Sequence, residues 1–279
     1  MKKRCSVHNI GTALGAGLLL CALLSSSLAS ASDGPREKRW SSQILETLLI
    51  GEAVWLKGDK DKKFLSLYTK AEGTPKGAVL LLHDEGLHPD WPEVIFPLRT
   101  RLPEQGWASL SLQMPILPLT GAPFTVFSPM LDEAPARIHA GIEFLHAQGF
   151  KHIIVIGHGL GAAMGTAYLA KTPHSGIDGL VGIAMGAPTS DRPRYQPDSR
   201  LNTPTSIAKF KLPVLDLYGA LDDKNVTDSA ALRIAAARKA GNKDYQQMRV
   251  PDADHYFSRY DKILLEKVSA WLDKHQTTR

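Results

Sequence analysis

The sequence contains almost no cysteine: its 279 residues include two, Cys5 and Cys21, and both lie within the first 31 residues. The remainder therefore has no disulfide, no thiol nucleophile and no zinc site built from thiolates. Long apolar runs are also missing. The most apolar stretch, at residues 14–24, is shorter than the about 20 residues that a permanent membrane-spanning helix needs.

The N-terminal segment has the three parts of a secretory signal peptide: basic residues at 2–4, the apolar run at 14–24 and Ala-Ser-Ala at 29–31. We expect export across a bacterial inner membrane, with cleavage that leaves a periplasmic or secreted protein without a stable membrane span. An uncleaved anchor and a lipoprotein are the alternatives. Leu20 argues against a lipoprotein, because those signals place a small residue just before the cysteine, here Cys21.

Charge gives no sign of a nucleic-acid partner. The whole chain has 33 Lys and Arg against 28 Asp and Glu, but three of the basic residues lie in the predicted signal. The predicted mature chain has 30 basic and 28 acidic residues, a net charge of +2, and no block of Lys and Arg. Residues 32–279 are long enough for one domain with a substantial core, and we see no repeat or linker that divides them.

Strand-like and helix-like segments alternate from about residue 62 onward, which predicts an α/β protein with a mainly parallel sheet and helices on both faces. The strand-like runs are residues 64–68, 78–82, 107–112, 152–156, 180–185, 214–218 and 245–250. The helical segments are residues 90–105, which would begin at an Asp90 cap, and residues 132–147, 160–170, 229–240 and 260–274. Ligands of such sheets bind beyond the carboxyl ends of the strands.

Between a predicted strand and helix lies Gly157-His158-Gly159-Leu160-Gly161. This segment resembles the nucleophile elbow G-x-S-x-G, whose glycines permit a sharp turn from strand to helix. The flanking glycines match in spacing. The central residue does not, because Gly159 stands where the elbow has serine.

Three other predicted strands end in polar residues. His83-Asp84-Glu85-Gly86 follows the strand at 78–82. Asp222, with Asp223 beside it, follows the strand at 214–218, and His255 follows the strand at 245–250.

Together these segments resemble the α/β-hydrolase superfamily over nearly all of residues 32–279. The resemblance implies that Asp222 or Asp223 is the acid of a catalytic triad and that His255 is its histidine, in the usual order nucleophile, acid, histidine. It also implies an oxyanion pocket formed by the loop at His83, Asp84 and Glu85 together with His158 and the Leu160 amide. Asp84 and Glu85 are unusual there, because that pocket must accept negative charge.

Residues 83–115 are also similar to an uncharacterised family of secreted α/β-hydrolase-like proteins of proteobacteria, from which no settled activity follows. The features that carry this similarity are His-Pro-Asp-Trp-Pro at 88–92, Gly106-Trp107 and Leu-Gln-Met-Pro at 112–115.

Because the elbow lacks serine, two functions are possible: ligand binding without catalysis, or hydrolysis by an unconventional route. Loss of the serine from a working triad reduces turnover by about 10⁶, and the elbow offers no other hydroxyl or thiol. We therefore expect a non-catalytic pseudohydrolase that binds a small-molecule or envelope ligand, or a protein partner. The alternative is an unconventional esterase-type hydrolase in which the His255–Asp222 dyad activates water.

We expect no cofactor and no metal. His83, His158, His255 and Asp222 would meet at one edge of the sheet, and such clusters can bind zinc. However, active serine hydrolases commonly carry histidine at the positions of His83 and His158, which accounts for both without a metal.

Two long loops are candidates for shaping a pocket. Residues 113–130 are apolar and rich in proline, and residues 187–211 carry five cations at a place where this fold often inserts a lid. Ordinary core packing of the first loop and solvation of the second are the simpler interpretations.

Overall fold

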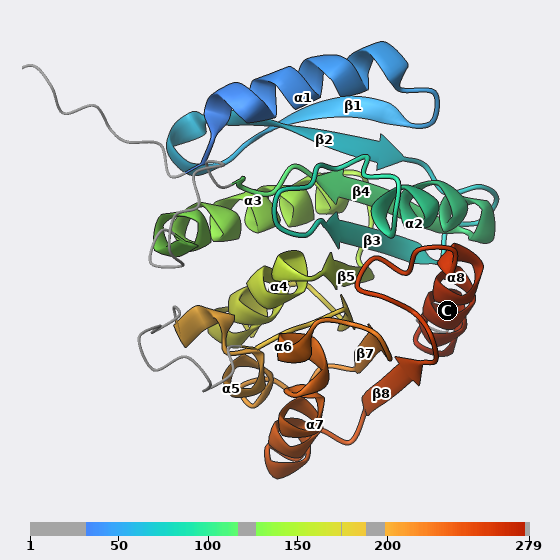
Figure 1. Ribbon diagram of the computed structural model, residues 1–279. Helices are drawn as coiled ribbons and strands as arrows, with labels where there is room; N and C mark the ends of the chain where they lie inside the picture. Colours follow the sequence, from blue (N-terminus) through green and yellow to red (C-terminus); the bar gives the residue numbers. More distant parts are fainter. Residues whose placement is uncertain (1–31, 117–126, 174, 188–198, 277–279) are drawn as a thin grey trace, which may run out of the picture. The chain divides into compact units, whose positions relative to one another are not determined.

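Figure 1 shows the computed structural model, which describes residues 32–116, 127–173, 175–187 and 199–276. Contacts divide the chain into Met1–Ser30 and Ala31–Arg279, and every described residue belongs to the second unit. The segment predicted to be a signal peptide, residues 1–31, lies outside the described residues. Export and a single domain at residues 32–279 therefore stay predictions.

The described strands form one sheet in the order β1-β2-β4-β3-β5-β6-β7-β8. β1 pairs antiparallel with β2 and β2 with β4, while the other neighbouring strands are parallel. The strands are β1 (Glu52–Lys57), β2 (Lys63–Thr69), β3 (Gly77–Leu82), β4 (Trp107–Leu112), β5 (Ile153–His158), β6 (Gly179–Ile183), β7 (Val214–Gly219) and β8 (Tyr245–Val250). The mainly parallel sheet confirms the predicted fold class.

Helices cover both faces of the sheet (Figure 1). They are α1 (Gly34–Thr47), α2 (Ile95–Arg101), α3 (Phe127–Ala147), α4 (Leu160–Lys171), α5 (Thr203–Ile207), α6 (Lys224–Thr227), α7 (Ala230–Lys239) and α8 (Asp261–Lys274). The apolar side chains of α3, α4, α5 and α7 belong to one core cluster, and those of α2 and α8 belong to a second. A small third cluster joins α1 to β2.

The period-two pattern of the strands explains this division. In β3, Ala78, Leu80 and Leu82 face the first cluster, while Val79 and Leu81 face the second. Successive side chains of a strand point to opposite faces, so a strand covered on both sides must be apolar throughout. The carboxyl ends of the parallel strands are thereby held at fixed positions along one edge.

The structure corrects the predicted helix at residues 90–105. Helix α2 begins at Ile95, its N-cap residue Val94 makes no side-chain cap, and a short 3₁₀ turn at Pro103–Gln105 follows it. Asp90 does not cap a helix. Its carboxylate accepts hydrogen bonds from the buried guanidinium of Arg99, because a buried cation needs a charged partner more than the helix needs a cap.

Neither α1 nor β1 was expected from the sequence pattern. The loop expected at residues 113–130 lies partly outside the described residues, and α3 begins within it at Phe127. Of residues 187–211, the stretch 188–198 is not described, and Thr203–Ile207 forms α5. The lid stays a prediction.

Candidate functional site

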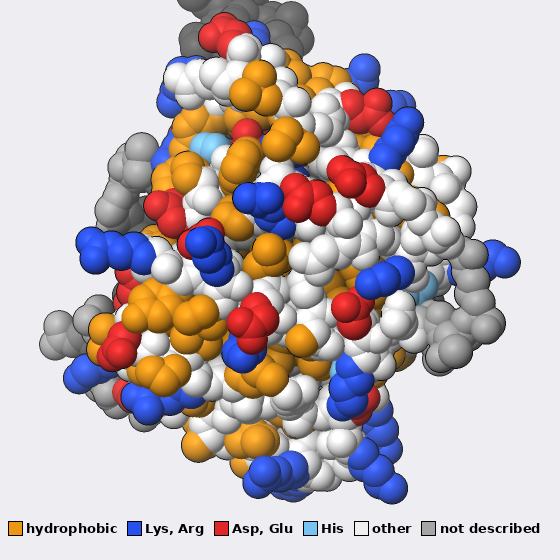
Figure 2. Space-filling model, turned by 90° about the vertical axis from the view of Figure 1, so that its right-hand side faces the viewer, with side chains coloured by type: hydrophobic (Ala, Val, Ile, Leu, Met, Phe, Trp, Pro, Cys, Tyr) orange, Lys and Arg blue, Asp and Glu red, His pale blue; other side chains and the backbone are white. Residues whose placement is uncertain are grey.

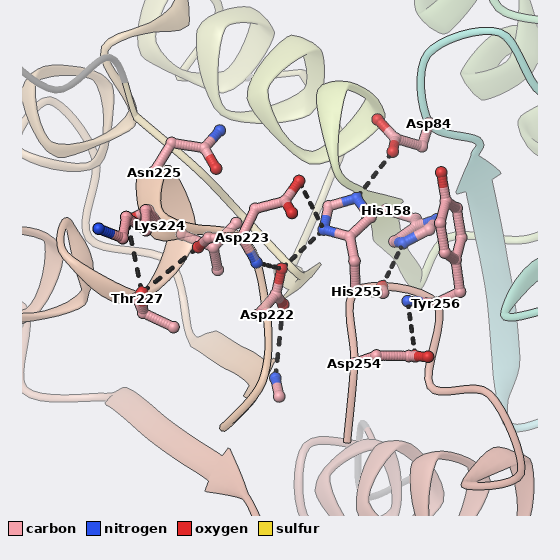
Figure 3. Close-up of polar contacts among 12 residues, drawn as sticks. Asp84, His158, Asp222, Asp223, Lys224, Asn225, Thr227, Asp254, His255 and Tyr256 are labelled. Atoms are coloured by element: carbon pink, nitrogen blue, oxygen red, sulfur yellow. Dashed lines mark hydrogen bonds and ion pairs between the residues drawn. The ribbon is translucent and has the colours of Figure 1, made fainter. Parts of the chain in front are cut away.

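Four strands deliver polar residues to the same edge of the sheet. Asp84 follows β3, His158 ends β5, Asp222 follows β7 and His255 follows β8. Figure 3 shows the carboxylates of Asp84 and Asp222 on either side of the His255 imidazole. The strand-end argument therefore predicted correctly which segments meet, although their contacts differ from the expected ones.

His255 is hydrogen-bonded to the acid at the end of β7. The distance from its Nδ1 atom to Oδ1 of Asp222 is 2.7 Å, while Oδ2 of the exposed Asp223 is 3.9 Å away. The Asp222 side chain is fully buried, and the backbone amides of Asp223 and Gly219 donate to its carboxylate. Asp222, and not Asp223, is thus the acid in hydrogen-bonding contact with His255.

Gly159 occupies the sharp turn between β5 and α4, with φ 50° and ψ −115°. The glycines on either side are needed for close packing. A Cβ on Gly157 would collide with the backbone of Ala162, and one on Gly161 with the carbonyl groups at the end of β3. The local backbone is therefore an elbow that presents no side chain at its apex.

Asp84 takes the space that a side chain at the apex would fill. A Cβ built on Gly159 would overlap the Asp84 carboxylate. Oδ1 of Asp84 accepts the backbone N–H of Leu160 at 2.6 Å, and Oδ2 lies 2.9 Å from Nε2 of His255. The Asp84 carboxylate thus fills the space of the nucleophile side chain. It also binds the Leu160 amide, which the resemblance assigned to the oxyanion pocket, and Nε2 of His255, the ring nitrogen that Asp222 does not bind.

The start of α4 favours this placement electrostatically. The Leu160 N–H is the first amide of the helix and has no acceptor within it, and the positive end of the helix dipole attracts a carboxylate. Burial opposes ionisation of Asp84, but the hydrogen bond from His255 and the neighbouring positive charge lower its pKa to about 2. Asp84 is therefore ionised at neutral pH.

His255 has the opposite shift. Burial alone would lower its pKa, but the hydrogen bonds to Asp222 and Asp84 and their negative charges outweigh burial and raise it to about 10. At neutral pH His255 is an imidazolium that donates from both nitrogens to two carboxylates. In this state it has no lone pair with which to accept a proton from water or from a hydroxyl group.

His158 and Tyr256 enclose the imidazolium. The fully buried His158 donates from Nε2 to the carbonyl oxygen of His255 at 2.9 Å, and burial lowers its pKa. Tyr256 packs edge-on against His255, with ring centroids 5.1 Å apart. Nothing in the sequence singles out Tyr256 beyond its position next to the histidine.

His83 supports the loop but does not face the imidazolium. Its Nδ1 atom lies 2.7 Å from the carbonyl oxygen of Asp84, and its Nε2 atom accepts the Met114 N–H at 2.9 Å. Burial lowers the pKa of His83 to about 3, so the ring is neutral. Glu85 lies at the surface, and the loss of part of its hydration together with the charge of Asp84 raises its pKa.

The residues that could bind a metal in the structure differ from those expected from the sequence. Asp84, His158 and His255 each bring one possible ligand atom within 4.8 Å of the others. His83 and Asp222, which the sequence places in the same cluster, are engaged in the hydrogen bonds described above. A metal would first have to displace the proton between His255 and Asp84, so this group carries no metal assignment.

Comparison with protein families gives a match over most of the chain. The family described as "Protein of unknown function (DUF3530)" matches residues 26–134 and 128–274. The chain belongs to this family. The comparison with curated proteins found no significant match to this chain.

Solved structures similar to this DUF3530 chain are α/β-hydrolases. Est1E from Butyrivibrio proteoclasticus, solved with ferulic acid, is 15% identical with a TM-score of 0.63 over 80% of this chain and 99% of its own. An esterase from Pyrococcus furiosus is 15% identical with a TM-score of 0.63, covering 84% and 94%. The esterase domain of a Rhodothermus marinus protein is 17% identical with a TM-score of 0.57, covering 81% and 99%.

These similarities establish the α/β-hydrolase fold for this chain and carry no substrate with them. Within the described residues, no helix is both long enough and apolar enough to cross a membrane.

Proposed function

We propose that this protein is an exported pseudohydrolase of the cell envelope, which binds a ligand at the carboxyl edge of the sheet and does not hydrolyse esters through a serine cycle. The observation that carries this proposal is the position of Asp84. Its carboxylate fills the space beside Gly159 and accepts the Leu160 N–H, so nucleophile space and oxyanion amide are both occupied.

Charge supports the same conclusion. The transition state of acyl transfer places a developing negative oxygen at the amide that follows the nucleophile. Here that amide already binds an ionised carboxylate. A second anion at the same position would be repelled, whatever nucleophile produced it.

Direct activation of water by the His255–Asp222 dyad is disfavoured for a related reason. A general base must have a lone pair at the operating pH, and the two flanking carboxylates keep His255 protonated. The dyad could act as a base only after Asp84 had moved away or lost its charge.

The exposure of Asp84 and His255 indicates where a ligand would bind. The side chains of Asp84 and His255 are 11% and 16% exposed, so the centre has limited contact with solvent. A small molecule that meets the carboxylate and the imidazolium from this side is the simplest ligand. We propose the periplasm or the cell exterior as the compartment, because of the secretory pattern at residues 1–31.

The test is an ester-hydrolysis assay with p-nitrophenyl esters of short and long acyl chains. We expect wild type to be inert. Gly159→Ser alone should also be inert, because its side chain collides with Asp84. The double variant Asp84→Gly/Gly159→Ser frees the apex and the Leu160 amide, and we expect it to gain hydrolysis.

The matched control is the triple variant that adds His255→Ala to the double variant. It should lose the gained activity, since a serine nucleophile needs the histidine as base. Hydrolysis by wild type that disappears in His255→Ala would refute the proposal and favour the water-activating dyad.

A further inference from the structure

We propose that the protein contains a binding site for its own mature N-terminus: removal of residues 1–31 creates an α-ammonium group on Ser32, and the carboxylate of Glu133 binds it. The inference rests on the proposed export, because cleavage after Ala31 is what creates this group. It goes beyond that proposal by giving the new terminus a partner and by linking removal of the signal to the stability of the fold.

Ser32, the first residue after the predicted cleavage site, is fixed inside the fold and is 6% exposed. Its hydroxyl group donates to Oε2 of Glu133 at 2.9 Å, although the two residues are 101 positions apart in the sequence. The next residue, Asp33, donates its backbone N–H to the carbonyl oxygen of Ile116 at 2.8 Å and caps helix α1 through its side chain. The start of the predicted mature chain therefore has a defined position next to α3.

The α-nitrogen of Ser32 lies near the Glu133 carboxylate for covalent reasons. The nitrogen and the hydroxyl oxygen of a serine are joined through the same two carbon atoms, so they lie within about 3–4 Å of each other. Because this hydroxyl contacts Glu133, an ammonium group on the nitrogen is within reach of the same carboxylate. In the precursor that nitrogen is an uncharged amide, whereas after cleavage it is a cation with three donors.

The groups around Ser32 carry the negative charge that a cation needs. Glu37 of α1 and Glu133 of α3 share the guanidinium of Arg137, whose Nη2 atom lies 3.1 Å from Oε1 of Glu37 and 3.4 Å from Oε2 of Glu133. Burial raises the pKa of Glu37, and the charge of Glu133 adds to this shift. A cation at Ser32 would offset that repulsion. The charged groups of this cluster and its neighbouring segments are Asp33, Glu37, Glu133, Arg137 and the half-exposed Lys62, whose Nζ lies 4.0 Å from Glu133.

Burial distinguishes this cluster from the charges on the surface. Figure 2 shows one face of the molecule, on which Lys and Arg side chains are interspersed with Asp and Glu. Water screens such exposed pairs, so each contributes little. The side chains of Glu37, Glu133 and Arg137 are only 13%, 11% and 7% exposed. A charge added beside them is screened much less, so the state of the Ser32 nitrogen should change stability measurably.

The same cluster supports the loop that carries Asp84. Nη1 of Arg137 donates to the carbonyl oxygen of Gln113 at 2.8 Å, and the side-chain nitrogen of Gln113 lies 2.9 Å from Nε2 of His83. His83 in turn donates from Nδ1 to the carbonyl oxygen of Asp84 at 2.7 Å. The mature terminus therefore lies at one end of a hydrogen-bonded path that leads to the Asp84 loop.

The ion pair would form only after export. Signal peptides are removed during export, so the precursor folds without the ammonium group and the exported protein gains it. A hydrogen bond to a charged group changes a folding equilibrium by about 10–100-fold. The precursor is therefore the less stable form and spends more time unfolded before it crosses the membrane.

The experiment compares two exported proteins by urea denaturation. Wild type should begin at Ser32, and the second protein has Gly-Gln inserted after Ala31, which moves the terminal amine two residues away. Below about pH 7 we expect a folding equilibrium constant about tenfold larger for wild type. The ion pair raises the pKa of the α-amine above its ordinary value of about 7.7–8.0, so this advantage is lost as pH rises through the raised pKa.

Glu133→Gln removes the carboxylate, and the two proteins should then be equally stable. Glu143→Gln supplies the matched control, because Glu143 lies on the same helix but is exposed, and it should leave the difference unchanged. A second measurement needs no variant. The pH dependence of acetylation of the Ser32 amine by acetic anhydride, read by mass spectrometry of the N-terminal peptide, should give a pKa above about 8.

Three results would overturn the inference: equal stability of the two proteins below about pH 7, a difference that persists in Glu133→Gln, or a Ser32 amine that titrates at its ordinary pKa of about 7.7–8.0. Mass spectrometry of the protein from cells separates this inference from the proposed function. A chain that keeps residues 1–31 refutes the proposed export and the ion pair together. Cleavage at another bond, or a Ser32 terminus without added stability, refutes the ion pair alone.

Discussion

Two aspartates of this protein, Asp84 after β3 and Asp216 within β7, are each surrounded by hydrogen-bond donors, yet they differ in what their partners can do. Asp216 is fully buried and bound by the fully buried Arg233, with Nε to Oδ2 at 2.8 Å. Asp84 is 11% exposed and bound by His255. An arginine partner is permanently charged and makes a structural ion pair, whereas a histidine partner can change its charge.

Removal of the Asp216 charge should have the largest effect on stability. Asp216→Asn leaves the buried guanidinium of Arg233 without a counter-charge, which costs about 3–5 kcal/mol when a buried pair is broken. Asp84→Asn should cost clearly less, because His255 can lose its proton and need not remain a stranded cation. Urea denaturation of both variants at neutral pH measures the difference, and equal losses would show that the two sites are alike.

The apex glycine offers the next test. Gly159→Ala introduces a Cβ that overlaps the Asp84 carboxylate at a φ of +50°, and we expect a loss of about 1–3 kcal/mol from overpacking. The same substitution in an Asp84→Gly background should cost less, because the steric part is gone. This is a double-mutant cycle on one contact.

Gly73 supplies the matched control for that cycle. Its φ is +69°, but an added Cβ would have no neighbour within 4 Å. Gly73→Ala should therefore show the backbone cost alone, about 1 kcal/mol. A Gly159→Ala cost no larger than that of Gly73→Ala would mean that Asp84 does not fill the apex.

A smaller effect should appear in the pH dependence of stability. Burial lowers the pKa of His255, but Asp222 and Asp84 raise it from 6.5 to about 10 in the folded protein. This raised pKa stabilises the fold fully below about pH 6.5, and the contribution is lost as pH rises through about 10. Asp84→Asn should flatten this decline in the free energy of unfolding, measured by urea titrations between these limits. Parallel declines in both proteins would contradict the contact.

The sequence predicted the fold and the strand ends well, because apolar runs and the alternation of elements directly reflect a sheet buried on both faces. It missed β1, whose residues are mostly exposed or half-buried, and α1, although Asp33 caps that helix and a proline stands in its first turn. In both cases the apolar pattern was too weak to be recognised.

The sequence indicated which residues meet at this edge of the sheet, but not the contacts that they make. His255 and Asp222 could be expected from their strand ends, but Asp84 was assigned to an oxyanion loop. Its actual position depends on how closely the ends of β3 and β5 approach, which sequence spacing does not reveal. The combination of an acid after β3 with a glycine at the elbow is the signal that could have suggested it, since each is unusual alone and the two complement each other in volume.

The most direct test of the account is the titration of His255 by nitrogen-15 NMR in wild type and Asp84→Asn. The groups that face this imidazole are Asp84, Asp222, Asp223, His158 and Tyr256. With Asp84 in contact, the pKa of His255 should lie near 10 in wild type and fall in Asp84→Asn, while Asp222 still holds it above its ordinary value. A wild-type His255 that titrates near pH 6.5 and does not respond to Asp84→Asn would contradict the claim that Asp84 has taken the place of the nucleophile.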